Sequence, residues 1–342
     1  MKNNKKFSDK VLTDFRKESP SKINIKKNSD FKDYLNLHLN LFENLKFPVE
    51  LFKNKKIVDL GCGTGEVDVV LNKFGGKLEC VDFNKKSIDY ANFIKKKKNL
   101  KNINFKNLRI EDYKVKKNFF DISISFGVIN HVYDQEGLFK KLVNSTKKGG
   151  YIILGFVEDA GLIQRLLHRA IIRRLSKKNE KKVYIYAKQL FSEHLNRSVK
   201  FGMRTYRGII NDYLINQVYY GLSSIKLNGW KKKYNLKFYS SLPQIALPIR
   251  IDSATQNFDL EDKNLRKSIE SLYRLRSIFA QNKDESVYSK LLNLKNSNIS
   301  KNIETFIKDL TKILQNKNNY ASKKDMQKLK YLKKKLTFEI IN

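Results

Sequence analysis

A glycine-rich turn directly after an apolar segment is the feature that most constrains the fold. Residues 57–66 read Ile-Val-Asp-Leu-Gly-Cys-Gly-Thr-Gly-Glu, with an acid at Asp59 and glycines at Gly61, Gly63 and Gly65. Glycine has no Cβ and adopts positive φ without strain, so this backbone can turn sharply and lie against a ligand. The apolar run predicts a buried strand and the residues from Glu66 predict a helix, whose first N–H groups point back at the turn.

Two classes of ligand suit such a turn. A dinucleotide-binding turn has the spacing G-x-G-x-x-G and holds a pyrophosphate over the helix end. Here the spacing is G-x-G-x-G, and Glu66 stands where the last glycine would be. Its carboxylate would repel two phosphates, so a cationic sulfonium ligand with an amino-acid tail fits this acid-flanked turn better.

A second short strand, predicted at residues 77–82, also ends in an acid. Asp82 lies about 20 residues after the turn, the distance at which an α/β nucleotide fold presents a carboxylate to ribose hydroxyls. A strand-end turn aspartate is the alternative, and the pairing with the glycine turn favours the ligand role. Phe83 follows and is placed to pack either against adenine or into the core.

Three further strands are predicted at residues 102–106, 119–126 and 151–156, the last after a Lys-Lys-Gly-Gly turn at residues 147–150. The alternation of strands and helices from residue 56 to 156 predicts a doubly wound parallel sheet. Ligands of such sheets bind at the carboxyl ends of the strands, which puts Phe126 and Gly127 beside the ligand.

The glycine turn resembles motif I of class I S-adenosylmethionine (SAM)-dependent methyltransferases. The pattern FD…S.GV..H at residues 120–131 resembles the signature of their broad small-molecule group, of methyltransferase type 11. The resemblance implies an α/β, Rossmann-like doubly wound sheet that is mostly parallel with an antiparallel last strand, and SAM as cofactor. The cofactor-binding residues that it implies are Asp59, Gly61, Cys62, Gly63, Gly65, Asp82, Phe83, Ile110, Glu111, Phe126 and Gly127.

At two positions the resemblance does not assign a role directly. Many relatives carry an acid that meets the adenine amino group where this chain has Arg109, so Glu111 or Asp112 is the expected acceptor. His131 is the candidate general base, since histidine titrates near neutral pH. The alternative is that His131 only orients the loop, because methyl transfer needs an aligned nucleophile more than it needs a base. No metal site is expected.

The chain divides into four predicted parts. Residues 1–30 form a basic, mobile N-terminus, residues 31–251 the methyltransferase domain, and residues 257–342 a helical C-terminal extension. Residues 158–222 form a helical insertion that acts as a lid. The domain is expected to begin with a helix broken at Pro48 and to end with a helix at 223–234 and strands at 236–242 and 244–251.

The insertion supplies the candidates for binding the methyl acceptor. Residues 160–175 predict a helix with arginines on one face and leucine and isoleucine on the other, packed on the core or lying on a membrane surface or an acidic substrate. The candidate acceptor contacts that follow are Tyr206, Arg207, Asp212 and Tyr213.

The chain of 342 residues carries a formal net charge of +36, which leaves the class of acceptor open. A basic surface binds RNA by counterion release. The excess positive charge is mostly lysine, however, and these lysines are scattered along a chain that is rich in residues with AT-rich codons. The favoured function is methyl transfer to a small-molecule or lipid- or glycan-linked acceptor; the alternatives are an RNA methyltransferase and a non-catalytic SAM-binding partner protein. Two cysteines without metal-like spacing and no membrane-span pattern predict a cytoplasmic protein.

Overall fold

The computed structural model describes residues 28–157, 162–177, 179–202, 205–216 and 220–242. The chain forms two compact units, which are described separately. The described part of the first unit comprises residues 28–156, 184–202, 205–216, 220 and 233–242, and that of the second lies within 157–183 and 221–232. The predicted C-terminal extension at 257–342, the strand at 244–251 and nearly all of the N-terminal segment lie outside the described residues.

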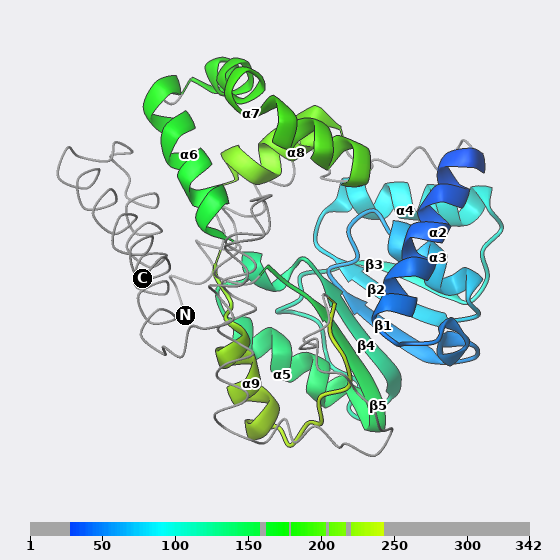
Figure 1. The fold of residues 1–342 in the computed structure, drawn as a ribbon. Helices are drawn as coiled ribbons and strands as arrows, with labels where there is room; N and C mark the ends of the chain where they lie inside the picture. Colours follow the sequence, from blue (N-terminus) through cyan, green and yellow to red (C-terminus); the bar gives the residue numbers. More distant parts are fainter. Residues whose placement is uncertain (1–27, 158–161, 178, 203–204, 217–219, 243–342) are drawn as a thin grey trace, which may run out of the picture. The chain divides into compact units, whose positions relative to one another are not determined.

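The first unit is built on a five-stranded parallel sheet (Figure 1). Its strands are β1 (Lys56–Leu60), β2 (Lys77–Asp82), β3 (Ile103–Asn107), β4 (Phe120–Phe126) and β5 (Thr146–Gly155), in the order β3-β2-β1-β4-β5. The predicted α/β, Rossmann-like fold class is confirmed. The strand order reverses between β1 and β4, and their carboxyl ends are where a doubly wound sheet binds ligands.

Helices cover both faces of this sheet. The helices α2 (Asn28–Asn44), α3 (Glu66–Lys73) and α4 (Lys85–Lys97) lie on one face, and α5 (Gln135–Ser145) lies on the other (Figure 1). Right-handed crossovers require this arrangement, because the chain moves outward through β2 and β3 and then returns through β4 and β5. The helix α2 begins three residues before the predicted domain start, and the 3-10 helix η1 (Val49–Phe52) follows the predicted break at Pro48.

The glycine pair before β5 does not form a separate turn, contrary to the sequence prediction. Residues 147–150 lie within β5, where the register against β4 shifts between Phe120 and Ile122. Gly149 has a φ of 79°, so the extra residues are accommodated as an irregularity of the strand.

The strand predicted at residues 236–242 is absent, since this described segment is irregular. Side-chain contacts hold it instead. The hydroxyl of Tyr239 donates to the carbonyl oxygen of Lys46 at 2.6 Å, and its ring packs edge-on against Phe47 and Tyr151. The alternating pattern that predicted the strand therefore reflects aromatic packing. The antiparallel last strand at 244–251 falls outside the described residues.

The described residues between β5 and residue 233 are mainly helical. It contains α6 (Leu162–Ser176), α7 (Glu180–Gly202), α8 (Tyr206–Ile210) and the π-helix η4 (Asn211–Ile215), followed by α9 (Ser224–Lys233). Phe191 has non-helical angles and kinks α7. Within the described ranges, no helix is long and apolar enough to cross a membrane.

The orientation of α6 differs from the amphipathic prediction. Arg165 and Arg169 are buried, with only 2% of Arg169 exposed, whereas Ile171 is 42% exposed. An arginine combines an apolar stem with five N–H donors, so it can be buried where those donors are satisfied. Periodicity detected the helix but misplaced its inner face.

Candidate functional site

The glycine turn folds over the carboxyl end of β2. The N–H groups of Gly61 and Cys62 both donate to the carbonyl oxygen of Val81, at 2.7 and 3.1 Å, and the N–H of Gly65 donates to Cys62 at 3.0 Å. The turn then enters α3 through Gly65, which has a φ of 74°. These bonds leave the first N–H groups of α3 at the edge of the sheet, as the sequence predicted.

The three glycines of the turn have different neighbours. A Cβ on Gly61 would overlap Val128 of the loop after β4, and a Cβ on Gly65 would overlap the ring of Phe105. These two glycines therefore allow close packing. Gly63 has a φ of 56° and no atom within 4 Å of the position of a Cβ, so it is the glycine of the turn that borders open space.

Asp82 lies beside this open space and is fixed by two backbone groups. The N–H of Gly63 donates to one carboxylate oxygen at 3.0 Å, and the N–H of Asn84 donates to the other at 2.8 Å. Burial raises the pKa of Asp82 above its ordinary value, while these two N–H groups act in the opposite direction. Each oxygen keeps further acceptor capacity, which suits a pair of ligand hydroxyl groups.

Two buried carboxyl groups lie beneath the turn, and sequence reasoning identified only one of them. Asp59 on β1 and Asp68 on α3 are almost fully buried. The side chains of Asp59, Asp68 and Cys80 interact with one another. Burial raises the pKa of Asp59 well above its ordinary value and that of Asp68 to about 7. The pair therefore holds a proton in the neutral range. The sequence signal for Asp68 was an acid inside the apolar face of the helix after the turn.

Further titratable groups surround this carboxyl pair. The hydroxyl of Thr64 donates to the buried carboxylate of Glu66. Tyr34 on α2 is buried, and its pKa is raised by burial and then by the charges of Glu66 and Asp68. Burial and the aspartates likewise raise the pKa of the thiols of Cys62 and Cys80, both of which are free. The turn thus lies on an acidic layer, which suits a cationic ligand.

The loop after β3 is tied to the end of β2. The N–H of Leu108 and the side-chain amide of Asn107 both donate to the carbonyl oxygen of Asp82, at 2.9 and 3.1 Å. Ile110 is buried, whereas the side chain of Glu111 is exposed and faces Arg109 at 3.7 Å. Ile110 is thus placed for an apolar contact next to Asp82. Phe83, directly after β2, is half-buried.

The loop after β4 forms the other side of the candidate site. Gly127 has a φ of 70° and no atom within 4 Å of a Cβ position, and its N–H donates to Gly155 at 2.8 Å. The ring of Phe126 occupies the place that a Cβ on Gly155 would take. His131 is half-buried at the end of the 3-10 helix η2 (Ile129–His131). It therefore lies four residues beyond the open backbone at Gly127.

The insertion meets this loop through a residue that sequence reasoning missed. The side-chain amide of Asn130 donates to the carbonyl oxygen of Tyr220 at 2.8 Å, and the N–H of Tyr220 donates back to Asn130 at 2.6 Å. The rings of Tyr133 and Tyr220 pack edge-on with centroids 5.9 Å apart. Tyr220 thus places an aromatic side chain next to η2. No local motif marks it, because the partner is 90 residues away.

The predicted acceptor contacts lie on α8 and η4. Tyr206 and Arg207 are exposed, and Lys188 of α7 lies 5.6 Å from the ring centre of Tyr206. Asp212 is half-buried, and Tyr213 packs against His194 of α7 with ring centroids 4.6 Å apart. The structure thus brings Tyr206 and Tyr213 against α7.

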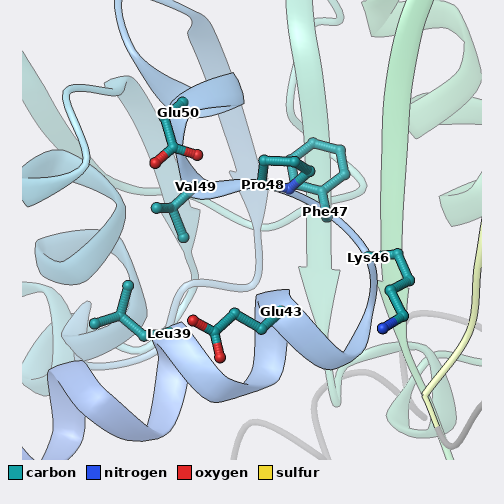
Figure 2. A pocket seen from close by; sticks show the side chains of 7 residues that line it. All are labelled: Leu39, Glu43, Lys46, Phe47, Pro48, Val49 and Glu50. Carbon is teal, nitrogen blue, oxygen red and sulfur yellow. The ribbon is translucent and has the colours of Figure 1, made fainter.

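A surface pocket elsewhere in the first unit is separate from this site (Figure 2). It is lined by Leu39, Glu43, Lys46, Phe47, Pro48, Val49 and Glu50, from the end of α2 to η1. These residues lead into the amino end of β1, whereas the glycine turn follows its carboxyl end. The pocket therefore lies at the opposite edge of the sheet from the open space at Gly63.

Comparison with known proteins identifies the family. The methyltransferase domain family matches residues 51–225, just over half of the chain. The chain belongs to this methyltransferase family. The predicted cofactor, SAM, and the predicted enzyme class, a SAM-dependent methyltransferase, are confirmed at the level of the family. The acidic layer and the open backbone at Gly63 fit a cationic cofactor.

Individual relatives cover only parts of the chain. It is 33% identical over 102 residues to a ubiquinone biosynthesis O-methyltransferase of Pelagibacter ubique, covering 30% of this chain and 42% of that protein. It is 32% identical over 115 residues to the ribosomal RNA small subunit methyltransferase G of Mesoplasma florum, covering 32% of this chain and 48% of that protein. The chain spans about half the length of the curated relatives it matches. A SAM-dependent methyltransferase structure from Mesorhizobium loti aligns with a TM-score of 0.33 and 18% identity over 37% of this chain and 58% of that chain.

Proposed function

We propose that the protein transfers the sulfonium methyl group of SAM to a small-molecule or lipid- or glycan-linked acceptor. The observation that carries the proposal is the open backbone at Gly63 beside the fixed carboxylate of Asp82. When bound, SAM supplies an electrophilic methyl group, which an aligned nucleophile of the acceptor takes while the carbon–sulfur bond breaks.

The donor side of the proposed site uses the edge between β1 and β2. Asp82 would accept hydrogen bonds from the two ribose hydroxyls, since the N–H groups of Gly63 and Asn84 fix the orientation of its carboxylate. Asp59 and neighbouring backbone groups would hold the cationic amino-acid end. The remaining proposed donor contacts are Gly61, Cys62, Gly65, Phe83, Ile110, Glu111, Phe126 and Gly127.

The acceptor side of the proposed site uses the loop after β4 and the insertion. The open backbone at Gly127 lies close in sequence to His131, and Tyr220 adds an aromatic wall through its bonds to Asn130. We propose that the predicted insertion at 158–222 acts as a lid through Tyr206, Arg207, Asp212 and Tyr213. Such a lid would exclude water and align the acceptor nucleophile, which is the main requirement of the reaction.

His131 is proposed as the base that removes the acceptor's proton. Its half-buried position at the end of η2 suits a group that meets a ligand and still exchanges protons with solvent. The alternative is an orienting role in the loop, because the N–H of His131 donates to Val128 at 2.8 Å and closes a turn there.

The relatives support two acceptor classes. Similarity to a ubiquinone biosynthesis O-methyltransferase favours a hydroxyl group of a small or lipid-like molecule, in keeping with the favoured function. Similarity to a ribosomal RNA methyltransferase favours the alternative, an RNA acceptor, together with the charge of +36. Two free cysteines support a reducing, cytoplasmic setting.

Transfer from SAM with a labelled methyl group into a cell extract tests the proposal. Label in low-mass or lipid fractions supports it, whereas label in RNA alone supports the alternative acceptor. SAM binding in calorimetry without transfer to any fraction would favour a non-catalytic SAM-binding partner. The Asp82→Asn variant should bind SAM more weakly and transfer less label. The matched Asp121→Asn variant, at the amino end of β4, should be unchanged in both.

A further inference from the structure

The outer face of α4 carries two aromatic side chains between two lysines. Lys86, Tyr90, Phe93 and Lys97 follow one another at spacings of four, three and four residues, which places them on one stripe of the helix. Phe93 is 48% exposed, and Tyr90 is half-buried. Their rings are stacked, with centroids 6.4 Å apart and an interplanar angle of 29°.

The charges around this stripe are strongly unbalanced. Residues 85–101 contain seven lysines and one acid, Asp89, whose carboxylate is held by Lys85 at 3.0 Å. Neither Lys86 nor Lys97 forms an ion pair with any residue in the described part of the chain. Like charges this close repel one another, and a polyanion bound over them would relieve that repulsion.

Lys98 lies among other cations at the end of the helix. Burial lowers the pKa of Lys98, and the charges of Lys73 and Lys97 lower it further. The ammonium of Lys98 lies 4.4 Å from the ring centre of Phe31 on α2. The positive region therefore continues from the α4 stripe toward α2.

The pairing of stacked rings with lysines selects the kind of polyanion. Nucleic-acid bases stack on aromatic side chains when they are unpaired, whereas a duplex keeps its base faces covered. Eleven residues of helix place the two lysines about 16 Å apart, a span of a few nucleotides. The hydroxyl of Tyr90 next to the rings provides a partner for a 2′-hydroxyl group, which favours RNA over DNA.

We propose that the α4 stripe, formed by Lys86, Tyr90, Phe93 and Lys97, binds single-stranded RNA. Bases stack on Phe93 and Tyr90, and phosphates contact the two lysines. Lys86, Phe93 and Lys97 are exposed on α4, and Tyr90 is half-buried at the border of the stripe, where it also packs against the core. Burial and then the charge of Glu66 raise the pKa of Tyr90. Ala91, on the opposite side of the helix, lies against Gly65 of the glycine turn. RNA binding is therefore a property additional to the proposed methyl transfer and independent of its acceptor.

Binding of a short fluorescein-labelled oligoadenylate to the full chain tests the aromatic part of the proposal by anisotropy. Phe93→Ala should weaken binding by about five-fold or more, the effect of losing one stacked base. Phe93→Trp should preserve binding, and its indole fluorescence should be quenched by the RNA beyond any quenching of Trp230, the single native tryptophan. The matched control is Phe238→Ala, since Phe238 is 43% exposed in another segment.

The lysine part is tested with charge-matched double variants. K86A/K97A should weaken RNA binding at least ten-fold and flatten its salt dependence. K114A/K117A removes the same charge from exposed positions outside the stripe and should change affinity less than two-fold. Asp82→Asn should bind RNA normally, which separates this proposal from methyl transfer.

Comparison of ligands completes the experiment. Single-stranded RNA should bind more tightly than DNA of the same sequence, duplex RNA, heparin or anionic phospholipid vesicles. Phe93→Ala should leave heparin and vesicle binding unchanged. The proposal would be overturned if the two double variants lost RNA affinity equally, or if Phe93→Ala bound RNA as tightly as the native chain. Binding of DNA or vesicles as tight as that of single-stranded RNA would also overturn it.

Discussion

Replacing Asp68 by asparagine should change how the stability of the protein depends on pH. Asp68 is fully buried on α3, and the pKa of its carboxyl group is raised from 3.8 to about 7, mainly by burial. Between these two values the folded protein keeps a proton that the unfolded chain has released. The stabilisation from this proton is complete below pH 3.8 and is lost as the pH rises through about 7.

The magnitude follows from the size of the shift. Each pKa unit corresponds to about 1.4 kcal/mol, so ionised Asp68 costs about 4 kcal/mol of unfolding free energy above pH 7. Between pH 5 and pH 8 the loss is about 3 kcal/mol. Asparagine has the same shape and no proton to lose. The stability of Asp68→Asn relative to the native chain should therefore rise by about 3 kcal/mol over this range.

Urea unfolding followed by far-ultraviolet circular dichroism measures this difference at several pH values. Groups that do not interact with Asp68 contribute equally in the two proteins and cancel in the difference. Loss of the Asp68 charge also removes one cause of the raised pKa of Asp59, which changes the difference in the same direction. Asp89→Asn is the control, because Asp89 is exposed and paired with Lys85, and its curve should run parallel to that of the native chain. Parallel curves for Asp68→Asn would refute a buried, proton-holding carboxyl group at this position.

Three further substitutions test the site. Asp82→Asn should weaken SAM binding in calorimetry by about ten- to hundred-fold, because charge-assisted bonds contribute about 1.5–3 kcal/mol. Gly63→Ala should weaken SAM binding and lower the melting temperature slightly, because its methyl group would enter open space and the only cost is alanine at a φ of 56°. Gly61→Ala should instead lower the melting temperature by several degrees, because the methyl group would overlap Val128. His131→Ala should bind SAM normally and lose methyl transfer at neutral pH, with partial recovery at higher pH.

Each of these predictions would be contradicted by a specific result. A Gly61→Ala protein as stable as the native chain would contradict the close packing of the turn against the loop after β4. A loss of stability in Gly63→Ala as large as that in Gly61→Ala would place Gly63 in the packed backbone. Full turnover by His131→Ala would leave His131 with the orienting role.

Several features of the fold followed directly from the sequence. The five strands, the glycine turn and the position of Asp82 were predicted because they depend on short segments: an apolar run, a glycine pattern and an acid at a set distance. The break before η1 was predicted because proline cannot continue a helix. The prediction of a strand at 236–242 was wrong, since alternating apolar residues also suit the aromatic packing of Tyr239.

Other features depend on contacts between residues far apart in the chain, and only the tertiary structure decided them. Val128 packs against Gly61, so glycine is required there for close packing, whereas Gly63 borders open space. Asp68 becomes a proton-holding group because the folded chain removes it from water beside Asp59. Burial and close approach are properties of the assembled chain, and no local pattern contains them. The sequence by itself therefore determined the kind of cofactor, whereas the tertiary structure decided which glycine of the turn borders open space and which carboxyl groups are buried beneath it.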